Sequence, residues 1–85
     1  MRNVKFTDEA RNSYIYWQTQ DKKTLKRINE LVKDAQRDPF TGIGKPETLK
    51  HSLTGFWSSR IDETNRLVYE ANEEDLVIIS CRYHY

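Results

Sequence analysis

The stretch "DKKTLKRINELVKDAQRDP" (residues 21–39) carries the clearest structural signal in the chain. Its apolar residues recur at the spacing of an α-helix and therefore share one helical face. They are Leu25, Ile28, Leu31, Val32 and Ala35. Asp21 is a favourable N-cap residue, and we expect the helix to end near Asp38 because Pro39 disfavours helical geometry at the residue before it. The stretch predicts an amphipathic helix that packs one face on a core.

The residues before this helix predict a strand and a second helix. "NVKF" (residues 3–6) reads as a short opening strand, and Thr7 is a suitable N-cap for the helix that follows. Ala10, Tyr14 and Trp17 are spaced as one helical stripe, so this helix also presents an apolar face. The N-terminal part of the chain therefore predicts the order strand, helix, helix.

The residues after position 39 are typical of strands joined by turns. "PFTGIGKPE" (residues 39–47) is a loop, with Gly42, Gly44 and Pro46 as its turn residues. Strand-like segments follow at residues 48–53, 56–61, 66–71 and 76–85, the first of them short. We expect residues 1–85 to form a single α+β domain of order β-α-α-β-β-β, with an antiparallel β-sheet and two N-terminal helices packed on one face.

Composition limits the classes of protein to consider. The chain has 85 residues, a formal net charge of +1 and 32% charged residues. No apolar run approaches the length of a membrane span, and the N-terminus lacks the apolar stretch of a signal peptide. Cys81 is the only cysteine, so there is no internal disulfide. We therefore expect a cytoplasmic protein with no membrane contact.

The chain stops on "CRYHY" (residues 81–85), an unusual concentration of reactive side chains. The preceding "LVIIS" is apolar enough to be a central strand, which would hold the end of the chain in place. If the strand continues, alternation puts Arg82 and His84 on one face and Tyr83 and Tyr85 on the other. We expect the face without helices to carry a site.

The candidate chemistry is acid–base catalysis without a metal. The sequence has no metal-binding motif and no glycine-rich phosphate loop, and Cys81 in an apolar strand is expected to be buried. A carboxylate can accept a proton, an imidazole can donate one, and guanidinium groups can stabilise a phosphate. This combination suits RNA cleavage by attack of a 2′-OH on the adjacent phosphate. The set comprises Glu47, His84, Arg60, Arg66, Lys50 and Arg82.

A simpler interpretation of these residues is also open. Glu47 would then be an ordinary surface residue, and the two arginines would form weak surface ion pairs with nearby carboxylates. Those carboxylates are Asp62, Glu63 and Glu70. The residues alone therefore indicate an α+β domain with a candidate RNA-directed site.

Several motifs resemble the YoeB/Txe family of bacterial toxins within the RelE-like superfamily. They are "YWQ" (16–18), "KRINELVKDAQRDPFTGIGKPETLKHSLTGFWSSRI" (26–61), "RLVYEA" (66–71) and the closing "CRYHY". The resemblance covers nearly all of the chain and implies a compact microbial-ribonuclease-like fold. One departure is Ser59, where the best-known relatives carry an arginine that would strengthen contact with ribosomal RNA.

The resemblance implies a function and assigns roles. Members of this family are toxins of type II toxin–antitoxin pairs that cut mRNA in the ribosomal A site and stop translation. Glu47 matches the general base, His84 the general acid, and Arg66 the group that stabilises the phosphate. The expected substrate-binding residues are Lys50, Arg60, Arg82 and Tyr85, with His51 in support.

The resemblance also implies partners. They are the 70S ribosome, mRNA and a YefM/Phd-like antitoxin whose disordered C-terminal segment folds on the toxin, and a homodimer is compatible with the family. No cofactor is expected. Two alternatives without catalysis remain open, namely a toxin of the same fold that inhibits DNA gyrase by binding, and a factor that only blocks the A site.

Overall fold

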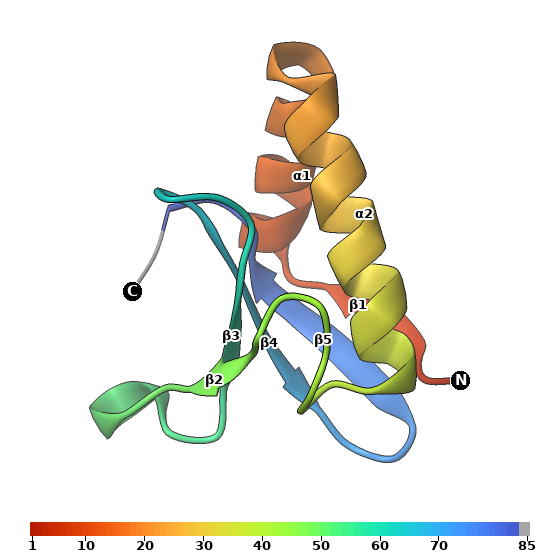
Figure 1. The fold of residues 1–85 in the computed structure, drawn as a ribbon, viewed down its shortest axis with the longest axis vertical. Helices are drawn as coiled ribbons and strands as arrows, with labels where there is room; N and C mark the ends of the chain where they lie inside the picture. Colours follow the sequence, from red (N-terminus) through yellow and green to blue (C-terminus); the bar gives the residue numbers. More distant parts are fainter. Residues whose placement is uncertain (84–85) are drawn as a thin grey trace.

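The structure is a computed structural model that describes residues 1–83, so His84 and Tyr85 lie outside the described residues. Two helices are followed by most of the strands (Figure 1). In chain order the elements are β1 (Asn3–Phe6), α1 (Asp8–Gln20), α2 (Lys22–Arg37), β2 (Glu47–Thr48), a short 3₁₀ helix (His51–Leu53), β3 (Trp57–Arg60), β4 (Arg66–Ala71) and β5 (Asp75–Ser80). The predicted order β-α-α-β-β-β is confirmed, with the small β2 strand at the edge of the sheet.

The sheet is mixed, which corrects the prediction of a wholly antiparallel sheet. Its strand order is β1-β5-β4-β3-β2. Strands β2 to β5 pair antiparallel with their neighbours, but β1 pairs parallel with β5, with Val4 opposite Leu76. Helices α1 and α2 separate β1 in sequence from the antiparallel strands β2 to β5. After α2 the chain enters the sheet as β2, at the edge opposite β1, so β1 is left to pair with β5. As predicted, β5 is a central strand.

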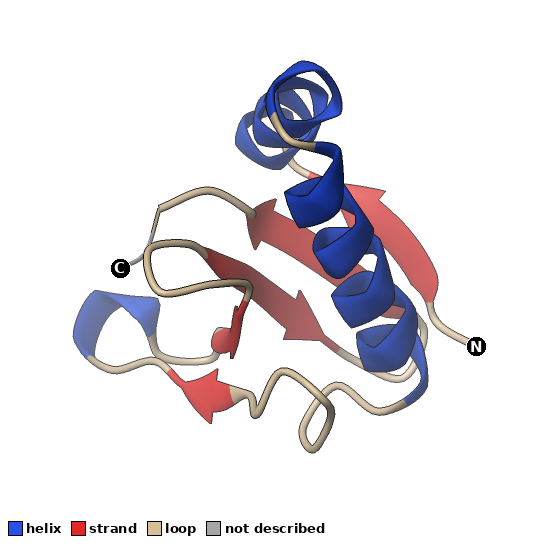
Figure 2. Cartoon of the chain, turned by 45° about the horizontal axis from the view of Figure 1, so that its top comes forward, coloured by secondary structure: helices blue, strands red, loops and turns tan. Residues whose placement is uncertain are grey.

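The two helices are joined through one residue. Asp21 ends α1 by donating its backbone N–H to Trp17 O, and it begins α2 by accepting the N–H groups of Lys23 and Thr24 with its side chain. Thr7 caps α1 by accepting the N–H of Ala10. All three predicted boundaries, at Thr7, Asp21 and Asp38, are therefore confirmed. The short connection makes α1 and α2 neighbours on one side of the sheet (Figure 2).

The core lies between these helices and one face of the sheet. The α2 stripe supplies three buried residues, and β4 and β5 supply the other half of the core from alternate positions. The buried members of this cluster include Ile28, Leu31, Ala35, Leu67, Tyr69, Leu76 and Ile78. Because side chains alternate along a strand, the intervening positions of β3 and β4 face away from the helices.

Two strand predictions were too long. Residues 48–53 form the end of β2 and a 3₁₀ helix instead of one strand, and β5 ends at Ser80 instead of running through the last residue. His51 has a φ of 60° and Tyr83 a φ of 63°, and a strand cannot continue through this left-handed geometry. Residues 81–83 are therefore a separate segment that follows β5.

The loop between α2 and β2 is held close to the sheet. Asp34 of α2 accepts the N–H of Ile43, and the Tyr69 hydroxyl donates to the carbonyl of Pro39. A Cβ on Gly44 would lie 2.7 Å from side-chain atoms of Leu31 and Ser59, so only glycine allows this approach. The loop thus delivers β2, and Glu47 with it, to the edge of β3.

Replacing Asp21 by Ala should destabilise the protein at neutral pH. Hydrogen bonds from Thr24 hold the pKa of Asp21 below its ordinary value, so the carboxylate stabilises the fold above that value and loses this effect as pH falls through the lower, folded-state pKa. Urea midpoints should differ between wild type and Asp21→Ala at pH 7, and the difference should narrow near pH 2 as the charge of Asp21 is lost. Asp21→Asn, which keeps an acceptor, should retain most of the wild-type midpoint. Equal midpoints for all three proteins at pH 7 would contradict this assignment.

The Cys81 thiol should be unreactive in the folded protein. Burial, with the charge of Glu9 as a smaller contribution, raises the pKa of Cys81 to about 12, and the side chain has no exposed surface. Because the thiolate is the reactive form, Ellman's reagent at pH 8 should label the native chain far more slowly than the chain in guanidinium chloride. Native labelling at the unfolded rate would show that Cys81 is open to solvent.

Candidate active site

Glu47 and Arg66 meet on the face of the sheet that the helices leave uncovered. Glu47 pairs with Ser58 across β2 and β3, and Arg66 pairs with Arg60 across β3 and β4. Residues paired in this way project to the same face, and the Arg66 side chain reaches diagonally toward the β2 edge. Its Nη2 lies 3.9 Å from Glu47 Oε2. Strand register therefore joins two of the three predicted catalytic residues, which are 19 positions apart in the sequence.

Ser58 fixes the direction of the Arg66 side chain. Arg66 Nε donates to Ser58 Oγ at 2.8 Å, and Nη2 donates to the Ser58 carbonyl at 3.3 Å. The Arg66 side chain is only 25% exposed, whereas that of Glu47 is 75% exposed. The guanidinium is thus anchored at its inner side, while the carboxylate remains accessible to a ligand.

Arg60 adds a second positive charge to this face. It lies directly opposite Arg66, and like charges in that position repel each other unless an anion or solvent compensates them. The Arg60 carbonyl accepts a hydrogen bond from Arg27 of α2, while its side chain is exposed. Lys50 is also exposed, at the N-terminus of the 3₁₀ helix. The pair of guanidinium groups makes this face suitable for a phosphate.

The described part of the chain end lies against the start of β4. The Tyr83 carbonyl accepts the backbone N–H of Arg66 at 2.7 Å, and the Tyr83 N–H donates to Asn65 Oδ1 at 2.7 Å. The predicted separation of Arg82 and Tyr83 on opposite faces is wrong, because the Arg82 guanidinium lies 4.6 Å from the centre of the Tyr83 ring. The predicted catalytic His84 and the predicted base-stacking Tyr85 lie outside the described residues.

Backbone strain is concentrated next to the predicted site residues. Within residues 1–83, the non-glycine residues with positive φ are Lys45, His51 and Tyr83. Each lies close in sequence to a predicted site residue. Lys45 is two positions before Glu47, His51 directly follows Lys50, and Tyr83 directly precedes His84. Such conformations are costly and persist where the surrounding structure enforces them, which is frequent at active sites.

The simpler surface-pair interpretation fits Asp62 poorly. Asp62 accepts backbone N–H groups from Thr64 and Asn65 and thereby organises the β3–β4 turn. Burial tends to raise the pKa of Asp62, but these hydrogen bonds outweigh it and hold the pKa below its ordinary value. The carboxylate that pairs with Arg66 is Glu47, which was not among the three expected surface partners.

Sequence reasoning missed two residues of this region. Ser58 has no signal in the sequence, because only the strand register shows that its hydroxyl faces Arg66. Asn65 belongs to the predicted turn "DETN", but its contact with Tyr83 joins segments 18 positions apart. Ser59, at the departure from the family pattern, is buried on the helix-covered side, where its Oγ lies 3.3 Å from the Tyr69 hydroxyl.

Residues 1–83 contain no cluster of three or more histidine, cysteine, aspartate or glutamate side chains that could hold a metal ion. Neither helix in this part of the chain has the length and apolar character needed to cross a membrane.

Comparison with known proteins identifies the family. Residues 6–85 match the model of the YoeB-like toxin of bacterial type II toxin–antitoxin systems. Toxin YoeB of Escherichia coli K12 is 55% identical over 80 residues, which cover 94% of this chain and 95% of that protein.

Solved structures of Staphylococcus aureus proteins agree with this match. The YoeB dimer superposes with a TM-score of 0.91 at 47% identity, and the alignment covers 99% of this chain and 98% of that one. The YoeB–YefM complex superposes with a TM-score of 0.90 at 45% identity, covering 100% of this chain and 99% of that one. The chain belongs to the YoeB-like toxins of bacterial type II toxin–antitoxin systems.

Proposed function

We propose that this toxin is a ribosome-dependent endoribonuclease that cuts mRNA in the A site by acid–base catalysis. The observation that carries the proposal is the Glu47–Arg66 pair on the uncovered face of the sheet, with the Tyr83 carbonyl bonded to the backbone N–H of the same arginine. A carboxylate beside a fixed guanidinium is what attack of a 2′-OH on a phosphodiester requires. Sequence similarity supports the toxin class, and the geometry supports this chemistry.

Glu47 acts as the general base in this proposal. Its exposed carboxylate takes the proton of the 2′-OH while the 2′ oxygen attacks the adjacent phosphorus. The bond between phosphorus and the 5′ oxygen then breaks. The products are a 2′,3′-cyclic phosphate and a free 5′-OH, so neither water nor a cofactor takes part in the step.

Arg66 stabilises the charge that grows on the phosphate oxygens in the transition state. The hydrogen bonds to Ser58 hold the guanidinium in place before substrate arrives, so little reorganisation is needed during the reaction. Arg60 and Lys50 bind the neighbouring phosphates of the message, and the repulsion between Arg60 and Arg66 is relieved when an anion binds.

His84 acts as the general acid and gives its proton to the leaving 5′ oxygen. It directly follows Tyr83, whose carbonyl is bonded to Arg66, so chain connectivity limits how far the imidazole can be from this guanidinium. Tyr85 stacks on a base of the message, and Arg82 contributes positive charge nearby. Loss of the imidazole should remove the acid while leaving the other two groups in position.

The partners follow from the family. The ribosome supplies most of the RNA contacts, which explains how a chain with a net charge of only +1 can act on RNA. The toxin would therefore act in the cytoplasm. A YefM-like antitoxin inhibits it through a segment that folds on the toxin, and the free toxin forms a homodimer. Structures of a YoeB–YefM complex and of a YoeB dimer from Staphylococcus aureus support these two partners.

Glu47→Gln and His84→Gln should each lower the rate of mRNA cleavage on ribosomes by about 100-fold, the usual contribution of a general acid or base. Both changes keep a polar side chain while removing the group that transfers the proton. Mapping of 3′ ends on ribosome-bound mRNA measures the effect. Glu73→Gln, in the exposed β4–β5 turn, is the matched control and should cut normally. Wild-type rates in both site variants, or inhibition of purified gyrase with intact mRNA, would reject the proposal.

The adjacent serines provide a test of how Arg66 is held. Ser58→Ala removes the Oγ that accepts from Arg66 Nε and should lower the cleavage rate about tenfold, as expected for a hydrogen bond to a charged group. Ser59→Ala removes the hydroxyl beside Tyr69 on the opposite face, so it should affect the urea midpoint more than the rate. Equal rates for Ser58→Ala and Ser59→Ala would show that the Ser58 contact does not position Arg66.

A further inference from the structure

We propose that α1 and the β3–β4 turn form a terminal seat, defined as Tyr16, Trp17 and Asn65, which positions the chain end for the reaction. This inference rests on the proposed function, because the residue that the seat would position is the general acid. The seat residues do not touch the reacting atoms in this account. They act through residues 81–83, which lead directly into His84.

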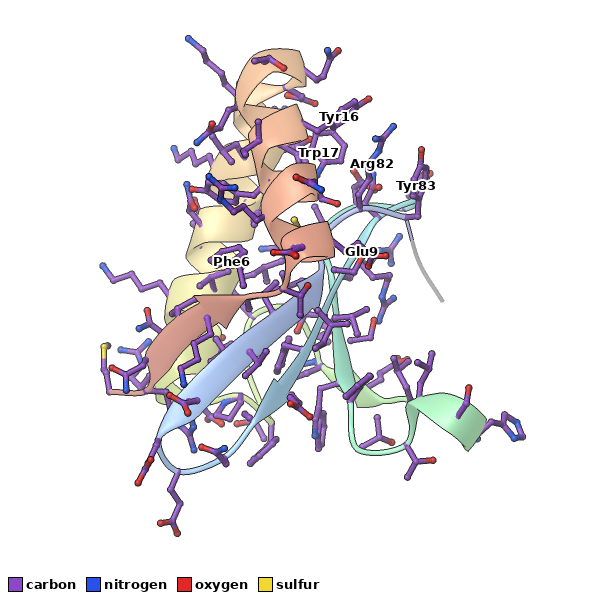
Figure 3. The ribbon with its side chains drawn as sticks, turned by 180° about the vertical axis from the view of Figure 1, so that it is seen from behind. Phe6, Glu9, Tyr16, Trp17, Arg82 and Tyr83 are labelled. Atoms are coloured by element: carbon purple, nitrogen blue, oxygen red, sulfur yellow. The ribbon has the colours of Figure 1, made fainter. Side chains whose placement is uncertain are left out.

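The α1 side of the seat contacts two successive residues. Trp17 Nε1 donates to the Cys81 carbonyl at 2.9 Å in a buried hydrogen bond. The Arg82 guanidinium carbon lies 3.6 Å from the centre of the Tyr16 ring, a close cation–π distance. Tyr16 in turn packs edge-on against Trp17, with ring centres 5.1 Å apart. Figure 3 shows Tyr16 and Trp17 on the side of α1 that faces Arg82 and Tyr83.

The sheet side of the seat contacts the third residue. Asn65 Oδ1 accepts the Tyr83 N–H, while Asn65 Nδ2 donates to the Asp62 carboxylate at 3.1 and 3.2 Å. These opposite demands fix the orientation of the amide. The Tyr83 carbonyl accepts the backbone N–H of Arg66. Three successive residues are therefore held in turn, two of them by α1 and one by the start of β4.

Burial of apolar surface does not explain why Tyr83 is held. Its side chain is among the exposed large hydrophobic groups, at 59%, and its φ of 63° is unfavourable for a residue with a Cβ. Chain ends normally fray unless they are tied down. Here the ties are directional contacts, namely hydrogen bonds and one ring–guanidinium stack, and such contacts set the direction in which the chain continues. We infer that these contacts hold residues 81–83 in order to position His84.

The test removes the ring of Tyr16 and leaves the catalytic groups intact. Tyr16→Leu should lower kcat for mRNA cleavage on ribosomes about tenfold, with little change in KM, because a cation–π contact of this kind contributes to geometry and not to RNA binding. Tyr16→Phe keeps the ring and should restore the rate. Tyr14→Leu is the matched control: it removes an aromatic ring from the same helix, but Tyr14 packs on Phe6 and bonds Asn29. It should lower the thermal midpoint without lowering kcat.

A double-mutant cycle separates positioning from substrate binding. If Tyr16 acts through Arg82, the losses in Arg82→Gln and Tyr16→Leu should not add in the double variant. Additive losses, a wild-type kcat in Tyr16→Leu, or an equal loss of kcat in Tyr14→Leu would each overturn the seat.

Hydrogen exchange distinguishes failure of the seat from failure of the proposed function. The Tyr83 amide, which donates to Asn65, should exchange faster in Tyr16→Leu than in Tyr16→Phe, and this readout needs no catalysis. If wild type does not cut mRNA, the proposed function fails, and equal Tyr83 exchange in the two variants would then overturn the seat independently. Cleavage that depends on His84 but not on the Tyr16 ring would overturn the seat alone.

Discussion

Arg66 is the residue on which the site depends. Its backbone N–H holds the Tyr83 carbonyl, and its side chain is fixed by Ser58 and directed toward Glu47. One residue at the start of β4 therefore sets the relative positions of the β2 edge and the chain end. Because the contacts use different atoms, they form together without competing.

The rest of the fold brings the partners of Arg66 within reach. Gly44 allows the loop after α2 to approach Ser59, which places β2 beside β3. The buried indole of Trp17, only 8% exposed, belongs to the core and at the same time bonds the Cys81 carbonyl. Helix α1 thus contacts residues 81 and 82, although the helices cover the opposite face of the sheet. Because Trp17 belongs to the core and also bonds Cys81, the cleavage rates of variants must be compared under conditions where each protein is equally folded.

Local signals made most of the fold predictable. Helical spacing, the caps at Thr7 and Asp21, and Pro39 located both helices, and alternation located β3, β4 and β5. The parallel pairing of β1 was not predictable, because no local pattern says which edge a first strand will join. Two contacts were not predictable for the same reason, because they join residues distant in sequence. They are the hydrogen bonds of Arg66 with Ser58 and of Tyr83 with Asn65. The resemblance supplied the roles of Glu47, Arg66 and His84, which spacing alone left open.

The most direct measurement is a structure of this toxin on the ribosome with an A-site mRNA that carries a 2′-O-methyl group and cannot be cut. We predict the Glu47 carboxylate at the 2′ oxygen, the Arg66 guanidinium on the scissile phosphate, and the His84 imidazole at the 5′ oxygen on the opposite side. This prediction would be contradicted if the message lay on the helix layer, or if the imidazole and the carboxylate contacted different phosphates.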